Sequence, residues 1–314
     1  MTLTETLLRE LRISERELAT LVRTAPERYK VYTIPKRTGG TREIAHPASE
    51  LKTAQRVVVK SYLETLPVHP CATAYRPGAS IRQNAERHSH NRAILKYDFT
   101  EFFPSITERA WLSYCDENET FGRQDAIMSG RLLFRRPKGG RILRLSIGAP
   151  SSPILSNVLM NAFDRAIYDR VTPHKITYTR YADDLTFSAE RTWNLKVVDG
   201  IIRSVINRLS YPKLTINNKK TILVTPKYHR QITGLVLTLD GRVSLGRDRK
   251  RNIRSAIFHY SQGKLDRKAE VKLAGTLAFA KDVEPEFYTR MERVYGKELI
   301  DNIKFSVNGY QRDQ

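Results

Sequence analysis

The sequence predicts an α+β fold in which strand hairpins pack against amphipathic helices. Apolar side chains occupy every second position in residues 175–180 and again in 185–188, which predicts two strands joined by a tight turn at Tyr181-Ala182-Asp183-Asp184. Residues 195–209 instead repeat aliphatic side chains at the spacing of one helix face. From Arg247 onward the pattern is helical and basic. Together these observations favour a mixed fold that ends in a separate helical subdomain.

Length and composition describe a globular protein. The 314 residues are 40% hydrophobic, enough to bury a full core in two or three subdomains. The sequence contains neither an apolar run long enough to cross a bilayer nor a signal-peptide pattern at its start. Cys71 and Cys115 are the only cysteines, which argues against a disulfide framework or a zinc site. We therefore expect a cytoplasmic protein with no membrane partner.

The net charge of +21 is the strongest bulk signal. Lysines and arginines are spread along the whole chain, so a folded surface this positive would repel itself without a polyanionic partner. Nucleic acid is the favoured partner and an anionic membrane surface the weaker alternative. Charge alone does not distinguish DNA from RNA, or an enzyme from a packaging protein.

The two aspartates at the tip of the central hairpin, Asp183 and Asp184, are candidate metal ligands. Adjacent carboxylates in a turn repel one another, and divalent cations are the obvious groups to offset that repulsion. The alternative is a solvated turn, because aspartate is common in turns for structural reasons. The tetrapeptide alone favours the solvated turn, and the rest of the chain reverses that judgement.

A further carboxylate follows a short apolar strand. Residues 93–98 end in Asp98, and Ser105 with Glu108 then predicts a capping box for a helix reaching about Tyr114. Open α/β sheets place reactive groups at the ends of buried strands, just before a turn. Because Ser105 is better placed to cap the helix, Asp98 has no evident local structural role, which raises the odds that it is functional.

Two loops could contact a substrate. A hairpin over residues 29–45 carries Lys36, Arg37 and Arg42 around a Gly-Gly turn, and could grip a triphosphate or a template backbone. A solvated basic hairpin is the equally simple alternative. Residues 147–153 form a loop of small residues before a helix, which would let a substrate approach the backbone closely.

The last third of the chain predicts a short strand at 214–216, a turn at 217–221 and a hairpin over 230–245 that turns at Asp240-Gly241. The helices that follow present basic side chains. A solvated charged face is the usual explanation, but so few acidic residues accompany them that we favour a nucleic-acid surface. The basic residues on the first of these helices are Arg247, Arg249, Lys250, Arg251 and Arg254.

In this order, the motifs resemble those of reverse transcriptases. Asp98 with Phe99-Thr100-Glu101-Phe102-Phe103-Pro104-Ser105, and Tyr181-Ala182-Asp183-Asp184, resemble the two catalytic motifs. Asn84-Ala85-Glu86-Arg87-His88 is similar to the Asn-Ala-x-x-His motif of the retron subgroup, and Ile232-Thr233-Gly234 to its Val-Thr-Gly motif. The resemblance covers all but the first helices.

The resemblance implies a right-hand polymerase with fingers, a palm built on an antiparallel sheet with helices, and a helical thumb. A helical extension would occupy residues 1–28 and the fingers residues 29–92. The palm would span 93–245, with an interleaved fingers segment at about 115–147. The thumb, residues 246–314, would bind RNA.

The implied chemistry is RNA-directed DNA polymerisation by two Mg²⁺ ions about 4 Å apart. Asp98, Asp183 and Asp184 would hold the ions, with Asp184 supporting the one nearest the primer and the Phe99 carbonyl adding a ligand. Lys220 is the candidate for protonating pyrophosphate, with Lys219 as a close second.

The resemblance also assigns the nucleotide site. Arg42 would meet the triphosphate, Phe103 would be the steric gate that excludes a 2′-hydroxyl, and Gly148 with Ala149 would let the template–primer pair lie against the backbone. Reverse transcriptases usually carry glutamine before that glycine, where this chain has Ile147. A hydrogen bond to the sugar is then missing or replaced, so nucleotide selection is expected to differ in detail.

For a retron enzyme, the implied partners are dNTPs and a cognate structured noncoding RNA of the msr-msd type. Synthesis would start from a guanosine 2′-OH and yield a branched RNA-linked DNA, msDNA, in anti-phage defence with a separate effector protein. RNA contacts would come from Asn84, His88, Thr233, Gly234 and the basic helices, mainly through RNA shape and phosphates. The alternatives are a group II intron-like or diversity-generating reverse transcriptase, or an inactive RNA-binding scaffold.

Overall fold

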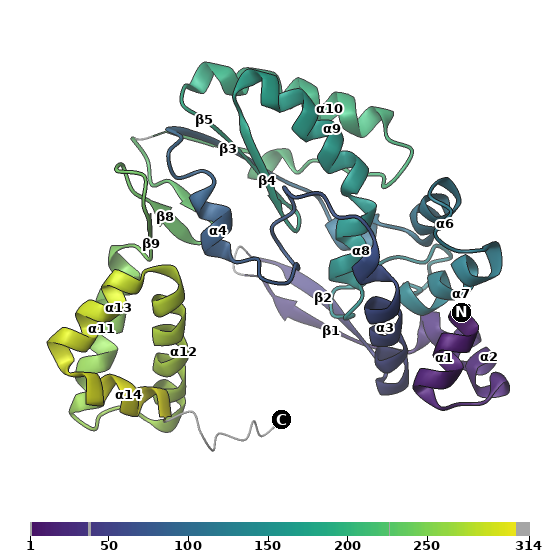
Figure 1. Cartoon of the computed structure of the whole chain (residues 1–314), viewed down its shortest axis with the longest axis horizontal. Coiled ribbons are helices and arrows are strands. Elements are labelled where there is room, and N and C mark those ends of the chain that lie inside the picture. The colour runs from purple at the N-terminus through teal and green to yellow at the C-terminus, as the bar shows by residue number, and fades with distance from the viewer. Residues whose placement is uncertain (1, 37–38, 226, 306–314) are drawn as a thin grey trace. The chain divides into compact units, whose positions relative to one another are not determined.

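The computed structural model describes residues 2–36, 39–225 and 227–305, so Arg37 of the basic hairpin lies outside the described residues (Figure 1). The chain forms two compact units, and it passes from one to the other repeatedly. The larger unit comprises Met1–Ala79, Leu95–Phe187 and Trp193–Leu223, and the smaller one Ser80–Ile94, Ser188–Thr192 and Val224–Gln314.

The larger unit begins with two capped helices, α1 (Leu3–Leu11) and α2 (Glu15–Thr24). The sequence Ser14-x-x-Glu17 predicts a capping box, and the structure confirms it, because each side chain accepts a hydrogen bond from the other's backbone N–H. The sequence pattern of residues 50–66 predicts a helix, and the structure forms α3 (Ser49–Ser61), which ends sooner than that pattern and is followed by a 3₁₀ turn.

The predicted basic hairpin is confirmed as strands β1 (Tyr29–Pro35) and β2 (Thr41–Pro47). They pair antiparallel from Tyr29 opposite Pro47 to Pro35 opposite Thr41. Strand β1 is largely exposed, whereas β2 buries Ile44 and Ala45. The Ala45 N–H donates to the carbonyl of Ile147 at 2.8 Å, which ties the hairpin to the small-residue loop.

A four-stranded sheet in the order β4-β5-β3-β6 carries the predicted central hairpin. Helices α9 (Asn161–Val171) and α10 (Val198–Arg208) lie side by side along it (Figure 1). Their buried side chains, with Phe187 from the sheet, form the core. The strands are β4 (Thr177–Tyr181), β5 (Asp184–Ala189), β3 (Ala93–Asp98) and β6 (Ile222–Val224).

The prediction of a strand at residues 214–216 is wrong. Only Ile216 pairs, in an isolated bridge with Phe99, and the fourth strand is β6 instead. The segment runs beside the chain just past the end of β3, where the Thr100 N–H donates to the Thr215 carbonyl at 2.8 Å. The overlap is too short for a ladder to form there.

The capping box predicted at Ser105 and Glu108 is also wrong. The chain forms a short helix α5 (Phe102–Ser105), becomes extended, and starts a new helix α6 (Glu108–Glu117). The Ser105 hydroxyl donates to the Phe102 carbonyl at 2.7 Å, and the Glu108 N–H donates to the Leu143 carbonyl at 3.0 Å. Both groups that the box would have joined therefore bond elsewhere. Helices α7 (Arg123–Leu133) and α8 (Ser152–Leu159) complete this unit.

The smaller unit contains α4 (Ile81–Glu86), opened by the capping box of Ser80 and Gln83. Helix α4 contacts a three-stranded antiparallel sheet whose last two strands flank the predicted Asp240-Gly241 turn. Four helices follow. The strands are β7 (Gln231–Ile232), β8 (Leu235–Leu237) and β9 (Val243–Ser244), and the helices α11 (Arg247–Ser261), α12 (Arg267–Val283), α13 (Pro285–Tyr295) and α14 (Lys297–Phe305).

One hydrophobic cluster joins the first and last segments of the smaller unit. It combines Ala85 and Ile94 with Ile232 and Leu235 of the small sheet and with buried side chains of all four terminal helices. The compact unit therefore does not begin at residue 246, where the predicted thumb begins, because residues 80–94 share its core. Among the described residues, no helix combines the length and apolarity that crossing a membrane requires.

Candidate active site

The backbone brings the three predicted aspartates to one end of the central sheet. Asp98 ends β3, Asp183 lies in the turn between β4 and β5, and Asp184 begins β5. The turn is sharp because Ala182 takes a left-handed conformation, with φ of 57°. The Phe99 N–H donates to the Asp183 carbonyl at 3.3 Å, which fixes the end of β3 against the hairpin tip.

The carboxylates crowd one another. Burial, followed by repulsion from Asp98, raises the pKa of Asp183, although Lys220 and Arg42 partly offset the rise. Burial and then repulsion from Asp183 and Asp98 raise the pKa of Asp184 to about 6, against smaller opposing effects of Lys96 and Lys220. This end of the sheet therefore holds more negative charge than its own cations neutralise.

Lys220 reaches the carboxylates from a separate segment. Its ammonium Nζ lies 2.8 Å from Asp98 Oδ2, although about half of the lysine side chain is exposed. The Asn217 N–H donates to the Asp98 carbonyl at 2.8 Å, so the turn that carries Lys220 is fixed to the end of β3. Lys219 makes no ion pair within the described parts of the chain, which favours Lys220 of the two candidates.

The donor set fits a divalent cation by chemical type. No three His, Cys, Asp or Glu side chains converge as a preformed metal site among the described residues. The three aspartates nevertheless supply the hard oxygen donors that Mg²⁺ prefers. Burial, and after it repulsion between carboxylates, raises the pKa of Asp183 and Asp184, and a bound cation would offset both effects. The ammonium of Lys220 already partly fills that role at Asp98.

Behind the hairpin lies a buried ion pair that the sequence analysis missed. Arg180 on β4 and Asp164 on α9 are both fully buried, with Arg180 Nη2 2.6 Å from Asp164 Oδ2. The Tyr178 hydroxyl also donates to Asp164, at 2.9 Å. Burial alone would lower the pKa of Arg180, but the pair with Asp164 outweighs it and the net pKa is raised. An aspartate on the apolar face of a predicted helix was the available signal.

Arg180 also organises the backbone around the turn. Its Nη1 donates to the Ala182 carbonyl at 3.0 Å. Its own N–H donates to the Cys71 carbonyl at 2.9 Å, and its carbonyl accepts from the Thr73 N–H at 2.8 Å. The side chain and the backbone of Arg180 thus connect the aspartate turn to the segment around residues 71–73.

The predicted nucleotide-site residues fall in two groups. Arg42, on β2, lies close enough to lower the pKa of Asp183, and Phe103, half-buried, follows the end of β3. Gly148 has φ of 118°, and a Cβ there would lie 2.5 Å from His46 Cδ2. The neighbouring Ala149 is buried. The glycine is therefore required by packing against β2, and the structure does not place Ala149 on an open surface for template and primer.

Two of the predicted RNA-binding side chains are in the interior. Asn84 and His88 are fully buried, and His88 Nδ1 lies 2.6 Å from Ser188 Oγ. The expectation that they contact RNA directly is corrected here, because their side chains support the interior of the smaller unit. Thr233 and Gly234 instead form the tight turn between β7 and β8, with φ of 47° and 80°. Gly234 is exposed.

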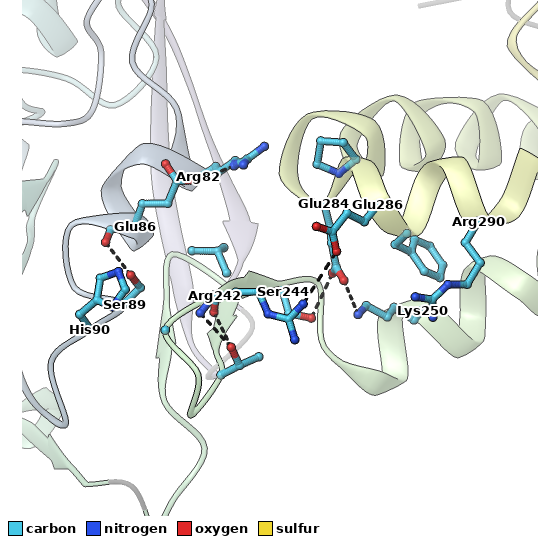
Figure 2. Close-up of a pocket in the computed structure, with 15 residues that line it drawn as sticks. Arg82, Glu86, Ser89, His90, Arg242, Ser244, Lys250, Glu284, Glu286 and Arg290 are labelled. Carbon is cyan, nitrogen blue, oxygen red and sulfur yellow. Dashed lines mark hydrogen bonds and ion pairs between the residues drawn. The ribbon is translucent and has the colours of Figure 1, made fainter.

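The basic residues of α11 are not equivalent. Lys250 is paired with Glu284, whose carboxylate also accepts from Ser244 Oγ at 3.0 Å and the Leu245 N–H at 2.9 Å (Figure 2). Ser244, Lys250 and Glu284 line a polar cavity of about 690 Å³ within the smaller unit. Arg249 is half-buried, with its guanidinium carbon 5.2 Å from the centre of the Phe279 ring. The exposed ones are Arg247, Arg251 and Arg254.

Comparison with known proteins identifies the family. A family model described as "Reverse transcriptase (RNA-dependent DNA polymerase)" matches residues 34–254. The chain is 37% identical over 284 residues to the retron Ec83 reverse transcriptase of Escherichia coli, an alignment covering 88% of this chain and 89% of that protein. This chain belongs to the retron reverse transcriptases. It is an RNA-directed DNA polymerase.

Further relatives agree. The retron Ec86 reverse transcriptase of Escherichia coli is 31% identical, with 93% of this chain and 90% of that protein covered. Among solved structures, apo telomerase from Candida tropicalis aligns with a TM-score of 0.52 at 14% identity. That alignment covers 89% of this chain but only 56% of the telomerase chain, and it bears on the fold alone. The predicted reverse transcriptase fold of mixed helices and sheets is confirmed.

Proposed function

We propose that this reverse transcriptase copies part of a cognate structured noncoding RNA into msDNA, starting from a guanosine 2′-OH. The observation that carries the catalytic part is the convergence of Asp98, Asp183, Asp184 and Lys220 at one end of the central sheet. The retron part rests on the relatives named above. Anti-phage defence with a separate effector protein, in the cytoplasm, belongs to the same proposal.

The proposed division of labour assigns each polar side chain one task. Asp98, Asp183 and Asp184, with the Phe99 carbonyl, would hold two Mg²⁺ ions, which when bound activate the primer hydroxyl and neutralise charge on the phosphates. Arg42 would orient the triphosphate through its guanidinium. Lys220 would keep a proton on Nζ beside Asp98 and donate it to the departing pyrophosphate. Phe103 would exclude a ribonucleotide by packing against the sugar.

RNA binding is assigned to the surface of α11, as part of a proposed thumb. Arg247, Arg251 and Arg254 are exposed and recur at intervals of four and three residues, which places them along one side of the helix. At a rise of about 1.5 Å per residue, successive members are about 6 and about 4.5 Å apart along the axis, a spacing that suits neighbouring phosphates. The exposed Gly234 turn is a second candidate contact. Fingers at 29–92 and a palm at 93–245 remain proposed divisions.

The test is to express the gene in a bacterium together with its native flanking DNA. After RNase treatment, a denaturing gel should show a short discrete DNA that changes mobility with RNase. The double variant Asp183→Asn/Asp184→Asn should abolish this band. A matched control, Asp116→Asn/Glu117→Gln, neutralises an adjacent exposed acidic pair on α6 and should retain it.

Other outcomes distinguish polymerase activity, msDNA synthesis and the assignment of the catalytic aspartates. Polymerase activity on a generic primed RNA, without a discrete DNA in cells, would retain the polymerase and exclude msDNA synthesis. A band that survives in the Asp183/Asp184 variant would exclude these aspartates as the catalytic pair.

A further inference from the structure

Tyr75 occupies an unusual place beside the candidate nucleotide site. Its φ is 59°, a left-handed conformation that is rare for a bulky residue, and its side chain is 44% exposed. The loop before it is firmly held, because the Thr73 N–H donates to the Arg180 carbonyl and Asn157 Nδ2 donates to the Ala74 carbonyl, both at 2.8 Å. A strained residue at the end of a well-anchored segment suggests a functional constraint on its side chain.

The ring of Tyr75 ends a row of aromatic contacts that begins in the core. Phe163 contacts Phe99 with ring centres 5.6 Å apart, and Phe99 stacks on Phe102 at 5.7 Å. Phe102 contacts Phe103 at 5.4 Å, and Phe103 contacts Tyr75 at 6.4 Å with the rings tilted by 51°. The first three rings are buried, whereas Phe103 is half-buried and Tyr75 is the outermost. Phe103 is therefore in contact with a ring of the core, Phe102, and with the outermost ring, Tyr75.

The electrostatics place the same tyrosine near the reacting groups. Burial, and after it the negative charge of Asp183, raises the pKa of the Tyr75 phenol, while Arg42 acts in the opposite direction. Tyr75 is thus close to a catalytic carboxylate and to the candidate triphosphate ligand, as well as to Phe103.

We propose that Tyr75 is a positioning residue that keeps the Phe103 ring in place, so that the exclusion of ribonucleotides depends on both rings. The inference rests on the proposed gate role of Phe103. A gate excludes a 2′-hydroxyl only if its ring cannot move aside, and Phe103 is only half-buried beside the interior ring of Phe102. Tyr75 supplies a second ring contact from a separate, hydrogen-bonded loop, which would restrict movement of the Phe103 ring.

The experiment measures single-nucleotide incorporation on a primed RNA template, with a dNTP and the rNTP of the same base. Removing the ring in Tyr75→Ala should raise the rNTP-to-dNTP ratio of kcat/KM by about tenfold, with the gain in the rNTP value. Tyr75→Gly removes the ring but suits the left-handed backbone, and should behave as Tyr75→Ala does. Tyr75→Phe keeps the ring and should retain the wild-type rNTP-to-dNTP ratio of kcat/KM.

Two further variants define the outcome. Tyr168 on α9 is also 44% exposed, so Tyr168→Ala is the matched control and should leave sugar selection unchanged. Phe103→Ala should raise ribonucleotide use, and the double variant Tyr75→Ala/Phe103→Ala should select no worse than Phe103→Ala alone, because the two rings act together.

Each contrary result has a distinct meaning. If Phe103→Ala leaves selection unchanged, the gate role fails and the role of Tyr75 fails with it. If Phe103→Ala acts but the Tyr75 ring deletions lower dNTP and rNTP incorporation equally, only the inference about Tyr75 is overturned. Additive effects in the double variant would likewise show that Tyr75 acts independently of Phe103.

Discussion

Asp164 and the pair Asp183 and Asp184 are two acidic sites linked to the same hairpin turn, and the charges around them differ. Asp164 is fully buried, bonded to Arg180 at 2.6 Å and to the Tyr178 hydroxyl at 2.9 Å. Asp183 and Asp184 have raised pKa values because burial and neighbouring carboxylates are only partly offset by nearby cations.

The comparison separates charges that support structure from charges reserved for chemistry. A buried carboxylate needs a close partner, and Arg180 provides one while also bonding the Ala182 carbonyl in the turn. The aspartates that follow are thereby held close together despite their repulsion. Perturbed carboxylates on a rigid support are typical of an active site.

The largest expected effect is on catalysis. Asp183→Asn/Asp184→Asn should lower DNA synthesis by at least about 10³-fold, because it removes the proposed carboxylate ligands of the metal ions. Thermal stability should stay the same or rise, since the variant removes mutual repulsion. Primer extension and thermal melting of the same preparation test both statements. A large drop in melting temperature would instead assign these aspartates to the structural group.

The next largest effect should be on stability. Asp164→Asn leaves Arg180 charged and buried without its counterion, which should cost about 3–5 kcal/mol in the free energy of unfolding. Urea denaturation measures this change. The control is Asp199→Asn, which breaks an exposed pair with Arg203 and should cost less than about 1 kcal/mol. If the two variants lose equal free energy of unfolding, the buried Asp164–Arg180 pair supports the fold no more than an exposed pair does.

Lys220 combines features of both acidic sites: it forms an ion pair with Asp98, as Arg180 does with Asp164, but its side chain is half exposed. Lys220→Ala should lower the rate of nucleotide addition by about 10²-fold as a general acid is lost, whereas Lys219→Ala should change it little. Single-turnover kinetics at saturating dNTP provide the measurement. If Lys219→Ala has the larger effect, the assignment of the proton donor is reversed.

The smallest expected effect is on the reactivity of the buried thiol of Cys115. Burial raises the pKa of Cys115 to about 12, so the thiol should stay protonated and resist alkylation by iodoacetamide at pH 8. The unfolded chain ionises this thiol at lower pH, so Cys115 should reduce stability as pH rises above about 9. Mass spectrometry of native and urea-unfolded samples tests the reactivity. Rapid native labelling would contradict the burial.

The sequence predicted where the candidate catalytic aspartates lie because alternation and turn residues act locally. The hairpin around Asp183 and the Ser14 capping box needed only neighbouring residues, and both are present. The predicted strand at 214–216 failed because its pairing depends on where the distant β3 ends. Asn84 and His88 were assigned RNA contacts because their motif resembles that of the retron subgroup, and only the folded unit shows that they are buried.

Tyr75 and Arg180 were missed for a related reason. Neither the left-handed φ of Tyr75 nor its contact with Phe103 follows from the loop sequence. The pairing of Arg180 with Asp164 joins a strand to a helix across a turn, so periodicity within either element cannot reveal it. Local patterns thus located the reacting groups, whereas their supports required the three-dimensional structure.

The discontinuous smaller unit also has a consequence for synthesis on the ribosome. Ala85 and Ile94 emerge early, but their partners include Ile300 and Ile303 near the other end of the described chain. At about 5–20 residues per second, the intervening stretch of about 200 residues takes roughly 10–40 s to translate. During that interval these apolar side chains lack their final neighbours, so nascent chains that stall before α14 are expected to depend on chaperones.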